Sequence, residues 1–212
     1  MDEHEQGELV RSWLRQNGGA IFGGIAIGLA GILGWQWWQH GKDQHRLDAS
    51  SAYQALEEAV ERKDTAGIDQ FAAELSEKFT DTPYGTLGLL RLAEQKIAQG
   101  DADAAQTALA DAARAAQSPA LAALANLRLA RVQLAAGKAQ EALDTLTKLP
   151  AGDFTGLAAE TRGDALLALG RKDEAEAAFQ EALTSLDTSA PNRFIVEMKL
   201  ADMGVAATEP GA

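Results

Sequence analysis

Apolar residues are concentrated in one segment near the N-terminus, while the rest of the chain mixes alanine, leucine and charged residues. Residues 18–38 read GGAIFGGIAIGLAGILGWQWW, and Gln36 is the only polar side chain in this run. At about 1.5 Å per residue, a helix of about 20 residues crosses the roughly 30 Å hydrocarbon layer of a membrane. The pattern therefore predicts one transmembrane helix over residues 18–38.

Two other interpretations of this segment fit less well. A cleaved signal peptide would have a shorter apolar region, followed by small residues at a cleavage site. Here Trp35, Trp37 and Trp38 follow, as in the aromatic belt where a membrane helix meets water. A buried helix of a soluble protein is disfavoured by the seven glycines of the segment, since each costs up to about 1 kcal/mol relative to alanine.

The charges that flank the segment do not fix its orientation. Arg11 and Arg15 precede it, and Lys42 and Arg46 follow it, so the count of positive charges is tied. An anchor of this kind usually leaves its short tail inside the cell and exports the longer part. We therefore expect residues 1–17 to be a cytoplasmic tail, with the part of the chain after the membrane helix exported.

Small residues recur on one face of the predicted membrane helix, at Ala20, Gly24, Gly28 and Gly31. Such spacing lets a second helix approach closely in lipid, where packing drives association. The alternative is that glycine is simply commoner in membrane helices. Both interpretations stay open at this point.

Beyond the anchor, the pattern is helical. Residues 42–79 carry an apolar stripe of Tyr53, Leu56 and Val60, with a polar break at residues 63–64. Thr82-Pro83 and Ser118-Pro119 are typical helix starts, because each pairs an N-cap residue with proline at the first helical position. β-branched runs with strand alternation are missing, so the fold class is all-α.

The helices repeat with a period close to the 34 residues of a tetratricopeptide hairpin. Gly100, Gly137 and Gly170 each follow a leucine- and alanine-rich helix, and the sequence LRLA occurs at both 90–93 and 127–130. The last hairpin is nearest the consensus, with the residues Gly163, Ala175, Phe179 and Ala182. We predict a tetratricopeptide-like helical-hairpin solenoid over residues 39–205, a final helix over 192–203 and a disordered tail over 206–212.

Little in the sequence indicates catalysis. The net charge of −12 argues against nucleic acid, and the lack of cysteine excludes disulfides and thiolate metal sites. His40 and His45 do not share a helical face, and phosphate-loop and zinc-protease motifs are missing. We expect a protein that is not an enzyme and that needs no cofactor or metal.

Arginine and leucine recur on the first helix of successive repeats, where equivalent positions line one surface of a solenoid. Two interpretations stay open: a polypeptide-binding groove with an apolar floor and basic spots, or core leucines beside solvated arginines. The candidates for protein binding are Leu90, Arg91, Leu127, Arg128, Arg131 and Leu134, with Arg162 continuing the arginine series.

Several blocks resemble the YfgM family of ancillary SecYEG translocon subunits in Gram-negative bacteria. They are GWQWW at 34–38, SAYQ at 51–54, PYG at 83–85, NLRLARVQ at 126–133 and RGDALL at 162–167. The resemblance implies an inner-membrane protein with periplasmic repeats. It also implies association with SecYEG and with a PpiD-like membrane-anchored chaperone, and transfer of exported client polypeptides to periplasmic chaperones.

Two other functions remain possible from the sequence alone. The chain could be a periplasmic scaffold for another envelope process, such as cell-wall synthesis or division. It could also regulate a signalling protein through its cytoplasmic tail, although the 17 residues of that tail are too few for a folded effector domain.

Overall fold

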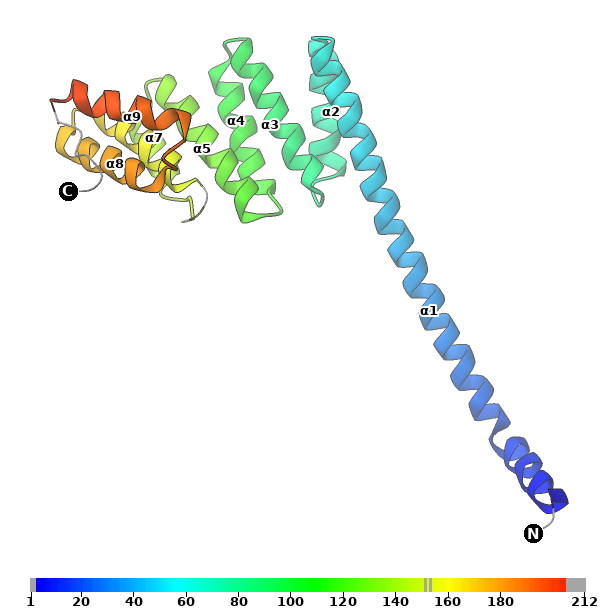
Figure 1. The fold of residues 1–212 in the computed structure, drawn as a ribbon. Coiled ribbons are helices and arrows are strands. Elements are labelled where there is room, and N and C mark those ends of the chain that lie inside the picture. The colour runs from blue at the N-terminus through cyan, green and yellow to red at the C-terminus, as the bar shows by residue number, and fades with distance from the viewer. Residues whose placement is uncertain (1–2, 151, 153, 205–212) are drawn as a thin grey trace. The chain divides into compact units, whose positions relative to one another are not determined.

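The computed structural model describes residues 3–150, 152 and 154–204, and divides the chain into two compact units, Met1–Asp48 and Ala49–Ala212. The regular elements of the described residues are all α-helices (Figure 1), as the sequence predicts. Helix α1, Glu3–Glu61, contributes residues to both units. The others are α2 (Thr65–Lys78), α3 (Pro83–Ala98), α4 (Ala102–Ala115), α5 (Pro119–Ala135), α6 (Ala139–Leu146), α7 (Thr155–Ala168), α8 (Lys172–Ser185) and α9 (Pro191–Asp202).

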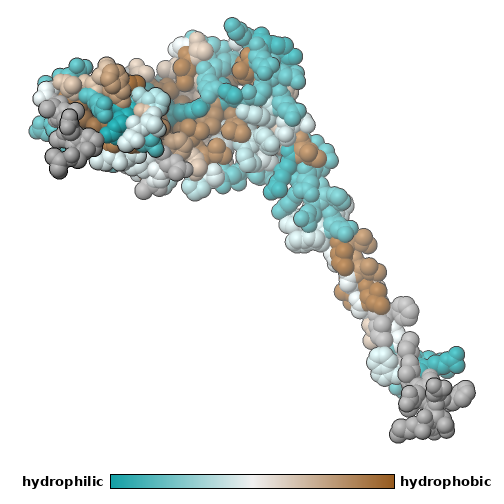
Figure 2. All heavy atoms as spheres, in the orientation of Figure 1, coloured by the Kyte–Doolittle hydropathy of each residue, from teal (hydrophilic) through white to brown (hydrophobic). Residues whose placement is uncertain are grey.

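The large apolar side chains that the structure describes in the first unit are exposed. Ile27 is 76% exposed and Trp37 is 82% exposed, and Figure 2 shows hydrophobic residues gathered along this part of α1. Full burial of such side chains is worth about 1.5–3 kcal/mol each, so this surface favours an apolar environment. Within the described residues, one helix is long and apolar enough to cross a membrane, in agreement with the anchor predicted over residues 18–38.

The second unit is a series of helical hairpins. The end of α1 packs with α2, and α3–α4, α5–α6 and α7–α8 form the following pairs, with α9 against α8. Each hairpin packs on its neighbours through a layer of leucine and alanine. This arrangement confirms the tetratricopeptide-like solenoid.

The turns inside the hairpins share one geometry. Gly100, Gly137 and Gly170 have φ of 78°, 77° and 74°, in the left-handed region that glycine adopts without strain. The next amide N–H after Gly100 donates to the carbonyl oxygen of Lys96 at 2.9 Å, the hydrogen bond that closes a Schellman motif. In the first hairpin, Lys63 takes the place of glycine with φ 54°. We call Lys63, Gly100, Gly137 and Gly170 the turn residues.

The predicted helix starts are correct, although their caps differ. α3 and α5 both begin on proline. The Ser118 hydroxyl accepts a hydrogen bond from the Leu121 amide at 3.3 Å, whereas the Thr82 hydroxyl donates to the Phe79 carbonyl oxygen at 2.8 Å. The final helix begins at Pro191 and ends at Asp202. The tail predicted over residues 206–212 lies outside the described residues.

Close packing in the last hairpin follows the repeat consensus. A Cβ atom on Gly163 would lie 2.5 Å from Phe179 Cε1, so only glycine lets α7 approach α8 here. Phe179 is fully buried, together with Ala175 and Ala182.

Helix α9 exposes three apolar side chains to solvent: Phe194, Ile195 and Met198.

Candidate interaction surface

The turn residues set a common register for the first helix of each hairpin. We call the residue nine places before each turn residue the minus-nine position; along the chain, these residues are Gln54, Arg91, Arg128 and Thr161. We call the residue six places before each turn residue the minus-six position; these residues are Glu57, Glu94, Arg131 and Asp164.

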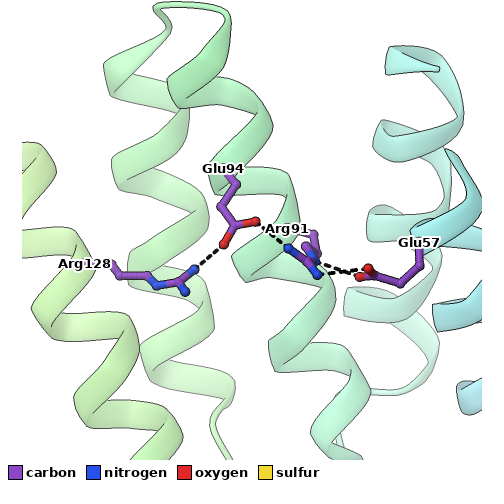
Figure 3. A network of polar contacts seen from close by, with 4 residues as sticks. All are labelled: Glu57, Arg91, Glu94 and Arg128. Atoms are coloured by element: carbon purple, nitrogen blue, oxygen red, sulfur yellow. Dashed lines mark hydrogen bonds and ion pairs between the residues drawn. The ribbon is translucent and has the colours of Figure 1, made fainter. Parts of the chain in front are cut away.

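At the first two junctions between hairpins, a minus-six carboxylate binds the minus-nine arginine of the next hairpin (Figure 3). Arg91 donates from Nε to Glu57 Oε1 at 2.7 Å and from Nη2 to Glu57 Oε2 at 2.9 Å. Arg91 Nη1 also donates to Glu94 Oε2 at 2.8 Å. The other oxygen of Glu94 accepts from Arg128 Nη1 at 2.5 Å. We call these four residues the ion ladder.

The ion ladder stabilises the charged forms of its members. Burial alone would raise the pKa of Glu57, but hydrogen bonds from Arg91 and from the Tyr53 hydroxyl hold it below its usual value. The two carboxylates raise the pKa of Arg91. Burial and the neighbouring Glu57 raise the pKa of Tyr53, so this hydroxyl stays protonated.

The third junction breaks this pattern. Arg131 occupies the minus-six position, where the other hairpins carry carboxylates, and Thr161 replaces the minus-nine arginine. Arg131 Nε donates to the Thr161 hydroxyl at 3.3 Å, and that hydroxyl donates to the Leu157 carbonyl oxygen. Within the described part of the chain, no carboxylate lies within 4.0 Å of Arg131.

The carboxylates nearest to this junction have another partner. Lys199 of α9 donates to Glu160 at 3.0 Å and to Asp164 at 2.8 Å. Burial raises the pKa of Asp164, while Lys199 and the more distant Arg131 oppose that rise. Lys199 therefore satisfies the acidic pair of α7, and the guanidinium of Arg131 is left with a neutral hydroxyl.

Two pockets share Arg131 and Ala135 in their linings, and together we call them the Arg131 cleft. The first has a volume of about 250 Å³ and is lined by Ile97, Gly100, Ala102, Arg131, Val132, Ala135 and Ala136. The second has a volume of about 340 Å³ and is lined by Arg131, Leu134, Ala135, Glu160, Thr161 and Asp164. The first is mainly apolar, because apart from Arg131 its walls carry aliphatic side chains or glycine.

The structure separates the predicted binding residues into groups. Leu90 and Leu127 are only 4% and 2% exposed, which corrects the expectation of an apolar floor: both side chains pack in the core between helices. Leu134 is half-buried and lines the cleft. Arg162 faces α8 and pairs with Glu181.

The remaining candidates differ in how much of their hydrogen-bonding capacity is used. Arg91 and Arg128 belong to the ion ladder, and Arg131 is exposed in its cleft. Sequence reasoning missed the ladder carboxylates, although Glu57 precedes Arg91, and Glu94 precedes Arg128, by the same 34 residues. That equal separation was the available signal.

The small residues of the anchor are open. Ala20 is exposed, and a Cβ atom on Gly24, Gly28 or Gly31 would meet no heavy atom within 4 Å. The face that they form can therefore accept a closely packed helix. Whether it does so stays a prediction.

Comparison with known proteins identifies the family of the chain. Residues 11–205 match the tetratricopeptide repeat-like domain family. The ancillary SecYEG translocon subunit of Escherichia coli (strain K12) is 30% identical over 207 residues, which cover 96% of this chain and 98% of that protein. This chain belongs to the YfgM family.

Other YfgM relatives match over a similar extent. The ancillary SecYEG translocon subunit of Haemophilus influenzae is 29% identical over 188 residues, covering 87% of this chain and 90% of that protein. The protein of the same description from Aggregatibacter actinomycetemcomitans is 26% identical over 182 residues, covering 86% and 89%. The names of these relatives support a role associated with the Sec translocon.

Proposed function

We propose that this chain is an ancillary, non-catalytic subunit of the Sec translocon. In this role it binds the SecYEG channel and a PpiD-like membrane-anchored chaperone, and helps to transfer exported polypeptides to periplasmic chaperones. The observation that carries the proposal is the match to relatives named ancillary SecYEG translocon subunits over nearly the full length of both chains.

The architecture supports a binding role. A solenoid of hairpins presents the first helix of each repeat side by side, which suits an extended polypeptide or a partner helix. The apolar segment of α1 provides a tether to the membrane. A tether raises the effective concentration of the domain for partners that are anchored in the same membrane.

The proposal includes an orientation, with the N-terminus in the cytoplasm and the repeat unit in the periplasm. A reporter enzyme that is active only in the periplasm, fused after Ala212, should be active. The same reporter fused before Met1 should be inactive. The opposite pair of results would contradict a periplasmic repeat unit.

Crosslinking in intact membranes tests the partners directly. A photoreactive amino acid at Ile97 or Leu134, which line the Arg131 cleft, should capture SecYEG subunits, the membrane-anchored chaperone or exported chains. The matched control is Gln140, exposed on α6 outside the lining of both pockets, which should capture less of them. Capture only of cell-wall or division proteins would overturn the Sec proposal in favour of another envelope scaffold.

A further inference from the structure

The third junction of the solenoid has an arginine where the pattern of the other hairpins calls for a carboxylate. The other hairpins have Glu57, Glu94 and Asp164 at the minus-six position. Each of these carboxylates forms an ion pair with a later helix: Glu57 with α3, Glu94 with α5 and Asp164 with α9. Arg131 forms none within the described part of the chain and donates only to Thr161. A guanidinium carries five N–H donors in a planar fork, so most of the donors of Arg131 stay available to a ligand.

Arg131 differs from the other cations near the cleft in lacking a carboxylate partner among the described residues. Arg91 and Arg128 pair with Glu57 and Glu94 in the ion ladder. Lys199 pairs with Glu160 and Asp164, which line the second pocket. These eight groups carry four positive and four negative charges, so the attraction for an acidic ligand comes from the unpaired guanidinium of Arg131 and not from an excess of positive charge.

The guanidinium is also held in place. Thr161, only 2% exposed, accepts from Arg131 Nε at 3.3 Å and is itself fixed by its hydrogen bond to Leu157. Bonding through Nε leaves the two Nη groups, which can bind a carboxylate in the bidentate geometry that arginine favours. A pre-positioned fork loses less side-chain entropy on binding.

We infer that the Arg131 cleft binds an extended polypeptide segment in which an aspartate or glutamate side chain lies two residues from an apolar residue, because alternate side chains of an extended chain face the same side. The carboxylate lies on Arg131, and the apolar side chain enters the pocket formed by Ile97 and Val132. Arg131 lines both pockets, so a chain that occupies both of them passes this residue. The ligand is therefore a side-chain carboxylate within a chain, and not a chain terminus. The inference rests on the proposed binding of polypeptide and names its chemistry.

The test uses the full chain in detergent micelles and two short peptides. Both are built on serine and alanine, acetylated and amidated, and carry either Leu-Ser-Asp or Leu-Ser-Asn at the centre. The wild-type chain should bind the Leu-Ser-Asp peptide about tenfold more tightly, because a hydrogen bond to a charged group is worth more than one between neutral groups. This preference should shrink as the salt concentration rises.

Three variants separate the contributions of charge and apolar contact. Arg131→Gln should abolish the preference, and Arg131→Glu, which restores the residue type of the other hairpins, should reverse it. Ile97→Ser should weaken binding of both peptides equally. The control is Arg114→Gln on α4, whose side chain is 78% exposed and pairs only with Asp111 in the described part of the chain; the preference should persist.

Equal binding of the two peptides to the wild-type chain would overturn the inference, as would a preference that survives Arg131→Gln in a variant with unchanged unfolding. If either of these results were found while the crosslinks to Sec partners were intact, the carboxylate site would be contradicted and the proposed function would not. Loss of those crosslinks at every position would instead contradict the proposed function.

Discussion

Glycine has opposite roles in the two units of this chain. In the first unit, each glycine between residues 18 and 34 faces open space, and an added Cβ atom would meet nothing within 4 Å. In the repeat unit, a Cβ atom on Gly67, Gly85, Gly88, Gly156 or Gly163 would lie less than 3.0 Å from a neighbouring atom. Glycine therefore leaves the surface of the first unit free of contacts, whereas in the repeat unit it allows neighbouring helices to pack closely.

This difference in glycine packing shows which unit supplies its own packing partners and which does not. The repeat unit buries its close-packed face against its own next helix, as Gly163 does against Phe179. The apolar segment presents an open face of small residues and exposed isoleucine and tryptophan. This is the surface expected of a helix that spans a membrane, and its face of small residues has room for another helix. Substitutions in the two units should accordingly change different observables.

The largest effect on stability should come from Phe179→Ala. The Phe179 ring is fully buried where α7, α8 and α9 meet, and its loss leaves a cavity worth about 3–5 kcal/mol. Urea unfolding of the full chain should be followed by circular dichroism, because all four tryptophans lie within residues 13–38 and do not report on the repeats. Phe194→Ala, at a site 66% exposed, is the control and should cost less than about 0.5 kcal/mol.

A smaller effect is expected from the opposite change at the same contact. Gly163→Leu should destabilise the repeat unit by roughly 1–3 kcal/mol, because the new side chain overlaps the ring of Phe179. Gly152→Ala, where a Cβ atom has open space, should be neutral or slightly stabilising since alanine restricts the unfolded chain. Equal unfolding midpoints for the two variants would contradict the close approach of α7 and α8.

The features that could be predicted are those encoded by local sequence. Gly100, Gly137 and Gly170 mark turns because the left-handed conformation strongly favours glycine. Gly163 and Phe179 follow the repeat consensus, and they do touch. The first hairpin was harder to recognise, because Lys63 forms the same turn without glycine.

The composition of the interaction surface depends on which helices and side chains pair in the fold, and the sequence does not specify these pairings. Helical periodicity does not distinguish an inner surface from an interhelical core, so it also favours a surface position for Leu90 and Leu127, which are buried. The sequence pattern presents Arg91, Arg128 and Arg131 as one series, whereas the turn residues place Arg131 in register with Glu57 and not with Arg91. Which arginine keeps its donors free follows from this register.

The ion ladder should make the repeat unit sensitive to acid. The pKa of Glu57 is lowered in the folded chain by Arg91 and Tyr53, against the effect of burial. Its contribution is therefore present above the unfolded carboxyl pKa of about 4.3, and is lost as the pH falls through the folded value. At neutral pH, Glu57→Gln should cost roughly 1 kcal/mol, the upper end for partly exposed pairs.

The measurement is the urea midpoint between pH 7 and pH 3. Glu57→Gln should lose less stability over this range than the wild-type chain, because it lacks the group that titrates. Glu77→Gln, at an exposed site on α2, should follow the wild-type curve. A Glu57→Gln curve parallel to that of the wild-type chain would mean that the ladder does not stabilise the fold.

The smallest effect on stability, and an effect of another kind, is expected in the first unit. Replacing Gly24 and Gly28 together by leucine should leave membrane insertion intact and the unfolding of the repeats unchanged within about 0.5 kcal/mol. Association with membrane-anchored partners should fall, because bulky side chains block the close backbone approach that small residues allow. Copurification from solubilised membranes measures the change.

The control is the pair Ala26→Leu and Ala30→Leu, which adds bulk on roughly the opposite side of the helix at 3.6 residues per turn. This pair should leave association intact. Equal loss in both pairs would show a general effect of bulk, and unchanged copurification in both would assign recognition to the repeat unit alone.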